Sequence, residues 1–251
     1  LLNLAPDGLP GWLQQWGHDF FNLQSFLSDF VETAINRYLG RVRIWEVSSR
    51  VNTGGAFKLN EEERLTLVAR TLEVARQVDE EAQLQIRIDQ PWGAYQAAGE
   101  HRLSPIQFVD ALLRCGVGLS GVNLEIAAGY NDQGASPRDL LDTSRLIDQW
   151  SMLEVPLSVT LAYPSTALPD PACTSPLVVR AESCSEEEQA KWIDKMVSLL
   201  MAKQSVVGIY WSHLADKGPH GFPNAGLINS DGTTKDGIQS FLKHRSGRSL
   251  S

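Results

Sequence analysis

Three carboxylic acids stand at or near the ends of apolar segments that predict buried strands: Glu46, Asp89 and Glu125. Two carboxyl groups about 5–5.5 Å apart can hydrolyse a glycosidic bond, one as acid and base and the other as nucleophile. A strand-end carboxylate can equally be the partner of an arginine, and the same pattern contains Arg43, Arg50 and Arg87. The residue types therefore leave a catalytic and a structural role open for each carboxylate.

The residues that follow the second of these strands predict a binding loop, with the sequence Asp89-Gln90-Pro91-Trp92-Gly93-Ala94-Tyr95. Gln90 offers both a hydrogen-bond donor and an acceptor, whereas Trp92 and Tyr95 offer flat faces. The Pro and Gly favour a tight turn between them. Alternatively, Trp92 plugs the opening that the loops surround, but we expect this segment to contact a ligand.

Metal and cofactor chemistry find no support in the sequence. His213, Asp216 and His220 could be read as a metal cluster, but their spacing matches no standard ligand pattern, so we predict no metal. There is no Gly-rich phosphate loop, no Gly-x-Ser-x-Gly segment and no His-Glu-x-x-His segment in the chain. We therefore predict no cofactor.

The composition narrows the range of partners. The 251 residues have a net charge of −8, which argues against a nucleic acid or an anionic membrane as partner. No apolar run reaches the roughly 18 residues of a membrane span, and Leu1 to Leu4 lack the features of a signal peptide. Cys115 predicts a buried thiol at a helix end, and Cys173 and Cys184 could pair or remain free. Localisation and oligomeric state stay unknown.

Apolar periodicity predicts strands and helices that alternate along the chain. The predicted strands cover residues 1–4, 41–47, 84–89, 122–126, 157–161 and 206–211. Start and stop signals predict a helix from about 23 that ends at Gly40, and helices that begin at Asn60 with Glu63, at Ser104-Pro105, at Ser136-Pro137, at Ser185 with Glu188 and near Lys235. The Pro-rich segment 162–183 predicts a long loop.

This alternation predicts a fold of the α/β class. The strands are too apolar to have one face in water, so we expect parallel strands covered by helices. No linker divides the chain, and we predict one domain over residues 1–251.

The segment Val206 to Lys235 resembles the last strand and its loop in family 10 xylanases, which are (β/α)8 glycoside hydrolases of clan A. The matching residues are Trp211, Asp216, Gly226-Leu227-Ile228, Asp231-Gly232 and Lys235. Leu9-Pro10-Gly11-Trp12-Leu13 is similar to the loop after the third strand of that family. The resemblance implies a TIM barrel of the endo-1,4-β-xylanase type.

The number of predicted strands is too small for a closed barrel of eight. Against family 10, the chain begins in the third strand, so about two βα units of roughly 30 residues each would be missing. We therefore expect an incomplete barrel of about six βα units, which corresponds to the C-terminal three quarters of the fold.

The resemblance also shows that the usual catalytic pair is not in place. The family's acid/base ends the strand that reads Trp45-Glu46-Val47-Ser48-Ser49-Arg50 here, which puts Arg50 at its position. The best match to the nucleophile strand puts Leu161 at the nucleophile position. Arginine does not give up its proton near neutral pH, and leucine cannot form a glycosyl intermediate. A substrate-binding His of the family falls near Pro6.

Other residues would then carry any chemistry. Glu125 stands where the family typically has Gln, and we predict it as catalytic with Asp89 or Glu46 as its partner. Trp211 and His213 resemble the wall of a sugar subsite. The remaining candidates for substrate binding are Arg50, Gln90, Trp92, Tyr95, Asn123, Tyr163 and Asp216, and Asn52 and Tyr130 could add hydrogen bonds.

Three functions remain open at the level of the sequence. The chain could be a glycoside hydrolase with an altered carboxylate pair that acts on a β-linked, xylan-like carbohydrate. It could be a non-catalytic glycan-binding barrel, in agreement with Arg50 and Leu161. It could also be an unrelated TIM-barrel enzyme, because a fold does not determine a function.

Overall fold

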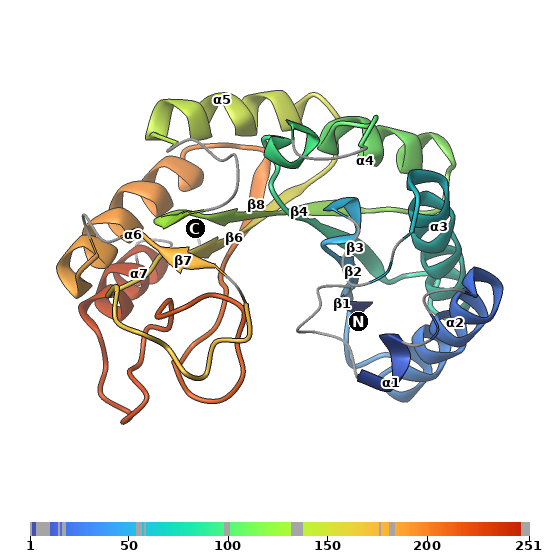
Figure 1. Cartoon of the computed structure of the whole chain (residues 1–251). Helices are drawn as coiled ribbons and strands as arrows, with labels where there is room; N and C mark the ends of the chain where they lie inside the picture. The colour runs from blue at the N-terminus through green and yellow to red at the C-terminus, as the bar shows by residue number, and fades with distance from the viewer. Residues whose placement is uncertain are drawn as a thin grey trace. The chain divides into compact units, whose positions relative to one another are not determined.

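A six-stranded sheet forms the centre of the fold (Figure 1). The computed structural model of the protein describes residues 2–3, 11–14, 16, 19–53, 57, 59–97, 101–131, 138–175, 177–180 and 184–246. Neighbouring strands of the sheet follow the order β1-β2-β3-β4-β6-β8. These strands are β1 (Leu2–Asn3), β2 (Ile44–Ser49), β3 (Gln83–Ile88), β4 (Gly121–Ala127), β6 (Leu157–Ala162) and β8 (Val206–Trp211).

Helices alternate with these strands along the chain. They are α1 (Gly11–Gln14), α2 (Phe20–Arg37), α3 (Glu61–Val78), α4 (Pro105–Arg114), α5 (Leu140–Ser151), α6 (Glu186–Met201) and α7 (Asp236–Ser246), with short 3-10 turns at Val51–Thr53 and Ala94–Ala97. The predicted α/β alternation is thereby confirmed, and the described residues form an incomplete (β/α)8 barrel. No helix in this part of the chain is long and apolar enough to cross a membrane.

The chain divides into two compact units, each described by itself. The first unit contains residues 1–124 and 153–157, and the second contains residues 125–152 and 158–251. In the first unit, β1, β2, β3 and β4 pair in parallel, which confirms the parallel pairing expected for the 84–89 and 122–126 strands. Helix α2 packs on α3, and α3 contacts β2 and β3.

In the second unit, backbone hydrogen bonds join the ends of three strands. The Ala128 N–H donates to the Ala162 carbonyl at 2.9 Å, and the Ser212 N–H donates to the Leu161 carbonyl at 2.9 Å. Helices α6 and α7 pack against each other, and α6 also contacts α5 and β8. The C-terminal ends of β4, β6 and β8 are therefore neighbours, and the long loops of this unit start from them.

Period-two burial explains why the sheet of the first unit has two different faces. Leu84, Ile86 and Ile88 of β3 are fully buried. Trp45 of β2 lies near Tyr38, which follows α2, with ring centroids 6.4 Å apart. Because successive strand residues point to opposite faces, the residues between these apolar ones face away from the helices. This second face carries polar side chains.

Helix starts follow the local signals in the sequence. The Asn60 side chain accepts a hydrogen bond from the Glu63 N–H, and the Glu63 carboxylate accepts from the Asn60 N–H, both at 2.9 Å. Ser104 and Gln107 form a second capping box before Pro105. The Ser185 hydroxyl caps α6 by accepting from the Glu188 N–H at 3.1 Å. The predicted starts of these three helices are confirmed.

Two local predictions were wrong. Helix α5 begins at Leu140 with Asp139 as its cap, so the expected start at Ser136-Pro137 was too early; those two residues, like Pro6, lie outside the described part. Cys115 is exposed, not buried. It follows the last residue of α4, and the buried stripe of that helix ends at Leu112.

The loop predicted for residues 162–183 contains a short strand. Strand β7 (Val178–Val179) pairs with β5 (Tyr130–Asn131) in an antiparallel ladder of two residues each. Such a ladder is too short to produce a periodic pattern in the sequence. Cys173 and Cys184 are both free thiols, so the pairing left open above is not formed.

We expect Asn60→Ala to lower the free energy of unfolding by about 1 kcal/mol, because the Glu63 N–H loses its partner at the start of α3. Asn60→Asp keeps an acceptor at the same place and should remain within about 0.5 kcal/mol of the wild type. Urea denaturation of the three proteins measures the difference. Equal loss in both variants would show that the cap does not stabilise α3.

Candidate functional site

Two side chains predicted for the site meet on the polar face of the first unit. The Glu46 carboxylate accepts hydrogen bonds from Arg87 Nη2 at 2.9 Å and from Arg87 Nε at 3.1 Å. It also accepts one from Asn123 Nδ2 at 2.8 Å. Both carboxylate oxygens are therefore engaged by N–H donors, as expected of an ionised group. The catalytic role predicted for Glu46 stays a prediction, and here the residue is the partner of an arginine.

The end of β3 is held by a buried asparagine. Asn52 Nδ2 donates to the Asp89 carbonyl at 2.7 Å, and the Asp89 N–H donates to Asn52 Oδ1 at 3.1 Å. One amide thus satisfies both backbone groups of a residue 37 positions away. The predicted Asp89-to-Tyr95 loop starts from this fixed point.

Two strand ends of the first unit adopt backbone conformations that side chains other than glycine rarely take. Arg50, directly after β2, has φ 58°, and Gln90, two residues after β3, has φ 47°. Residues with such angles cost about 1–3 kcal/mol and occur often at functional positions. The Gln90 Oε1 atom is buried and has no hydrogen-bond partner. Both residues were predicted to bind substrate, and strain at both is compatible with that role.

The two aromatic residues of the loop differ in their surroundings. Trp92 is half-buried. Tyr95 is buried, packs edge-on against His101 with ring centroids 4.8 Å apart, and donates to the Leu103 carbonyl at 3.5 Å. Burial raises the pKa of Tyr95, in spite of a hydrogen bond with Asn52. Trp92 therefore offers more open surface to a ligand than Tyr95 does.

A buried arginine that the sequence did not single out supports this region. Arg64 of α3 donates to the Asn52 carbonyl at 2.6 Å, and its two terminal nitrogens lie 3.2 Å from His101 Nδ1. Since an arginine has no acceptor, His101 Nδ1 accepts. Burial lowers the pKa of Arg64. A charged residue four positions after a helix cap gives no signal in the sequence that it will be buried.

In the second unit, Asp216 is the centre of a buried polar network. Its carboxylate accepts from the Gly226 N–H at 2.6 Å, lies 3.2 Å from His213 Nε2 and is paired with the Lys235 ammonium. Burial alone would raise the pKa of Asp216, but the hydrogen bonds from His213 and Lys235, with the lysine charge, lower it to about 2. The carboxylate is therefore ionised over the whole ordinary pH range.

The contacts of Lys235 and Gly226 show why the network around Asp216 needs these two residues. The Lys235 side chain is buried and also donates to Ser165 Oγ at 2.7 Å, which links the last helix to the loop after β6. A Cβ atom on Gly226 would lie 2.6 Å from both the backbone N and the Oδ1 of Asp216. The backbone can approach the carboxylate only because residue 226 has no side chain.

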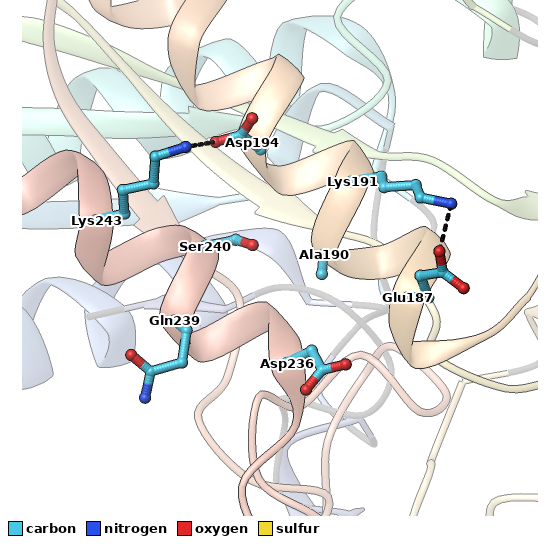
Figure 2. A pocket seen from close by; sticks show the side chains of 8 residues that line it. All are labelled: Glu187, Ala190, Lys191, Asp194, Asp236, Gln239, Ser240 and Lys243. Carbon is cyan, nitrogen blue, oxygen red and sulfur yellow. Dashed lines mark hydrogen bonds and ion pairs between the residues drawn. The ribbon is translucent and has the colours of Figure 1, made fainter.

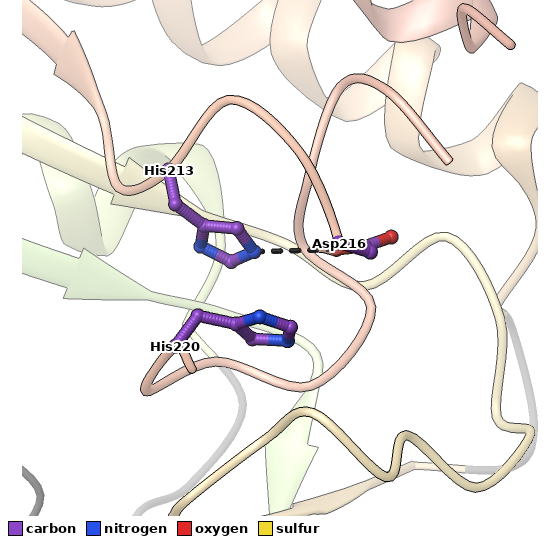
Figure 3. A group of neighbouring side chains, drawn as sticks. All are labelled: His213, Asp216 and His220. Carbon is purple, nitrogen blue, oxygen red and sulfur yellow. Dashed lines mark hydrogen bonds and ion pairs between the residues drawn. The ribbon is translucent and has the colours of Figure 1, made fainter. Parts of the chain in front are cut away.

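His220 forms polar contacts beside this network, and Figure 3 shows its ring next to that of His213. His220 Nε2 lies 2.8 Å from the Asp170 carboxylate, and His220 Nδ1 lies 2.9 Å from the Gly218 carbonyl oxygen. Its ring stacks on that of His213, with centroids 4.4 Å apart and an angle of 15° between the planes. Burial by itself would raise the pKa of Asp170, but hydrogen bonds from the Asn224 N–H and from His220 lower it below its usual value.

The ligand atoms of His213, Asp216 and His220 lie within 4.8 Å of one another, so their fit to a metal ion can be tested on their contacts. Both ring nitrogens of His220 lie within hydrogen-bond distance of oxygen atoms, of the Gly218 carbonyl and of the Asp170 carboxylate, so neither is directed at a vacant metal position. The Asp216 carboxylate is occupied by N–H donors, one of them a cation. The cluster is a network of satisfied hydrogen bonds and does not fit a metal ion.

Trp211 packs between helices. Its ring lies edge-on to Trp192 of α6 and Phe241 of α7, with centroids 6.3 Å and 6.2 Å away, and its indole N–H donates to the Ala225 carbonyl at 2.7 Å. The Tyr163 ring stacks on the Trp192 ring, with ring centroids 4.9 Å apart. The substrate role predicted for Trp211, Tyr163 and His213 stays a prediction. In the described contacts, Trp211 and Tyr163 belong to an aromatic cluster with Trp192.

The remaining strand positions are buried. Glu125 lies on β4 with 3% of its surface exposed, and Leu161 on β6 is fully buried. Leu161 lies two residues after Val159 and four after Leu157, which are also fully buried, as expected for the apolar face of a strand. The position that matches the family's nucleophile is therefore part of the core.

A pocket of about 530 Å³ lies between α6 and α7, and all of its lining residues belong to these two helices (Figure 2). Lys191 pairs there with Glu187 at 2.7 Å, and Lys243 pairs with Asp194 at 3.2 Å. Its other lining residues are Ala190, Asp236, Gln239 and Ser240. With four of its five charged lining residues in ion pairs and no aromatic side chain in its lining, this pocket does not have the character of a sugar site.

The structure brings some predicted residues together. Glu46 and Asn123 are in direct contact, as are His213 and Asp216. Sequence reasoning missed Asp170, His220 as its partner, Arg64 and the pairing of Asp216 with Lys235. Only the last had a signal, since both residues belong to the segment that resembles the xylanases.

The structure is similar to solved family 10 xylanases over nearly its whole length. It matches native xylanase 10B from Thermotoga maritima over 98% of this chain and 74% of that chain, with a TM-score of 0.66 and 16% identity. It matches a thermostable mutant of the xylanase Xyn10A from Cellvibrio japonicus over 98% of this chain and 77% of that chain, with a TM-score of 0.65 and 17% identity. It also matches xylanase 10B from Thermotoga petrophila RKU-1 in complex with xylobiose over 98% of this chain and 73% of that chain, with a TM-score of 0.65 and 16% identity.

These likenesses define the class of fold. The chain has the fold of the family 10 xylanases, a (β/α)8 barrel of clan A, and is glycoside-hydrolase-like in architecture. No family model and no curated protein matches its sequence.

We expect Asp216→Asn to lower the free energy of unfolding by about 3–5 kcal/mol at pH 7, because it leaves Lys235 buried without its anion. The wild-type carboxylate has a pKa of about 2 in the folded protein and 3.8 as its reference value. Its contribution is complete above pH 3.8 and is lost as the pH falls towards 2. The difference between wild type and variant should therefore shrink over that interval.

Chemical denaturation at a series of pH values from 7 to 2 measures this difference. Asp110→Asn on α4, where 42% of the side chain is exposed, serves as the control and should follow the wild type. A difference for Asp216→Asn that stays constant down to pH 2 would contradict the assignment.

Proposed function

We propose that this protein binds β-linked oligosaccharides of the xylan type at the C-terminal ends of its strands, without the usual double-displacement chemistry. The observation that carries the proposal is the xylanase fold combined with Arg50 and Leu161 at the positions of the catalytic pair. A retaining mechanism needs two carboxyl groups about 5–5.5 Å apart. Neither of these side chains can supply one.

The geometry of the first unit supports binding. Trp92 is half-buried in a loop whose starting point Asn52 fixes, and Gln90 is held in a strained conformation beside it. A flat aromatic face with polar groups at its edge suits a sugar ring, which has apolar faces and hydroxyls around its rim. One of the similar xylanases was solved with xylobiose, which supports the choice of ligand.

A specific observation favours a second candidate function, an altered glycoside hydrolase. Glu125 is a carboxylate buried on β4, where the family resemblance implies a Gln. In this hypothesis Glu125 acts with Asp89 or Glu46.

We further propose that residues 1–251 act as one domain.

The binding proposal predicts that Trp92→Ala weakens the affinity for xylohexaose at least about tenfold, because the ring loses its stacking partner. Isothermal titration of the chain with xylo- and gluco-oligosaccharides measures this. Phe21→Ala removes an aromatic side chain that is 79% exposed on α2 and should leave the affinity unchanged. Absence of oligosaccharide binding by the wild type would refute the proposal.

The hydrolase hypothesis makes a different prediction. Glu125→Gln should abolish any release of reducing sugar while binding persists, because the amide keeps the shape of the carboxyl group but cannot transfer a proton or attack. Asp89→Asn should lower turnover as well if Asp89 is the partner. Unchanged turnover in both variants would exclude these residues, and binding without any wild-type turnover would favour the non-catalytic function.

A further inference from the structure

The ion pair of Glu46 and Arg87 lies at mid-strand on the face of the sheet that points away from the helices. Trp45, the residue before Glu46, lies on the helix side, and Ile86 and Ile88 on either side of Arg87 are fully buried. Since neighbouring side chains of a strand alternate between faces, Glu46 and Arg87 must share the opposite one. Their mutual contact at 2.9 Å places them there together.

This face is accessible to solvent. The side chains of Arg87 and Glu46 are 28% and 27% exposed, whereas Asn123, which donates to Glu46, is only 2% exposed. The interior of a TIM barrel is normally filled by layers of bulky branched residues. Here a charged and partly exposed pair takes that place, and a buried amide donates to its carboxylate.

A register shift in β2 contributes to this placement. Glu46 lies opposite Gln85, but Ser48 lies opposite Ile86, so two residues of β2 correspond to one step of β3 at this point. Such a bulge bends the strand and redirects a side chain, and bulges occur often next to binding sites. Arg87 in turn pairs in register with Asn123 of β4. Three adjacent strands thus contribute one residue each to the group.

The geometry points to this group as a recognition site for the hydroxyls of a neutral sugar ring, with Glu46 as a binding residue, not a catalytic one. The inference rests on the proposed glycan binding. Neighbouring sugar hydroxyls each donate and accept hydrogen bonds, and the planar guanidinium and carboxylate offer donors and acceptors side by side. Their mutual pairing already compensates both charges, so a neutral ligand meets no unpaired ion.

The pairing of the Glu46 and Arg87 charges also determines which ligands bind less tightly. A uronic acid substituent would carry its carboxylate towards Glu46 as well as towards Arg87, and the repulsion would cancel the attraction. The site should therefore prefer unsubstituted xylo-oligosaccharides to those that carry glucuronic acid. A purely structural ion pair would give no such preference.

The preference for unsubstituted xylo-oligosaccharides provides a test whose expected result a mere loss of stability would not produce. Glu46→Gln keeps the shape of the side chain and its contact with Asn123 but removes the charge that compensates Arg87. We expect the ratio of the affinity for a glucuronic-acid-substituted xylo-oligosaccharide to that for xylohexaose to rise at least tenfold. Titration of wild type and variant with both ligands measures the ratio, and thermal unfolding verifies that the variant is folded.

A second variant covers the case in which the first does not fold. Arg87→Lys retains the positive charge but loses the planar fork, and should weaken xylohexaose binding at least tenfold without increasing the ratio. Arg114→Met on α4, which breaks an exposed ion pair with Asp110, is the control and should change neither quantity. A folded Glu46→Gln protein with an unchanged ratio, or an Arg87→Lys protein with wild-type affinity, would overturn this inference alone. A wild type that binds neither ligand would overturn the proposed function with it.

Discussion

Successive side chains of a β-strand point to opposite faces of the sheet, and this constraint governs both the core and the candidate site. In β3, Leu84, Ile86 and Ile88 form the apolar face, and Arg87 stands between two of them on the other face. Any polar residue at an intermediate position must then find a partner on the second face, and Glu46 provides that partner for both Asn123 and Arg87.

The segment that resembles the xylanases most closely serves the fold in its described contacts. Asp216 and Lys235 form a buried ion pair, and Gly226 lets the backbone reach the carboxylate. Removing one partner of such a pair leaves an uncompensated charge, at a cost of several kcal/mol. This requirement gives a physical reason for the residues of the signature to occur together in this chain.

The fold of this protein does not by itself determine its function. Identities of 16–17% with TM-scores of 0.65–0.66 establish the architecture, but an architecture can lose its chemistry when two side chains change. What remains in the first unit is a set of groups suited to contact a ligand: a half-buried indole, a strained strand end and a solvated ion pair. These features support binding more directly than they support hydrolysis.

The sequence by itself determined the features that depend on neighbouring residues. Alternating apolar segments specified the α/β class, and capping boxes such as Asn60 with Glu63 specified helix starts, because their partners lie three residues apart. Only the tertiary structure decided which distant groups meet: Asn52 with Asp89 across 37 positions, Asp170 with His220 across 50 and Glu46 with Asn123 across 77. Hydrogen bonds of this kind require the strands to be paired in register first, and the register follows from packing over the whole sheet, which no local pattern contains.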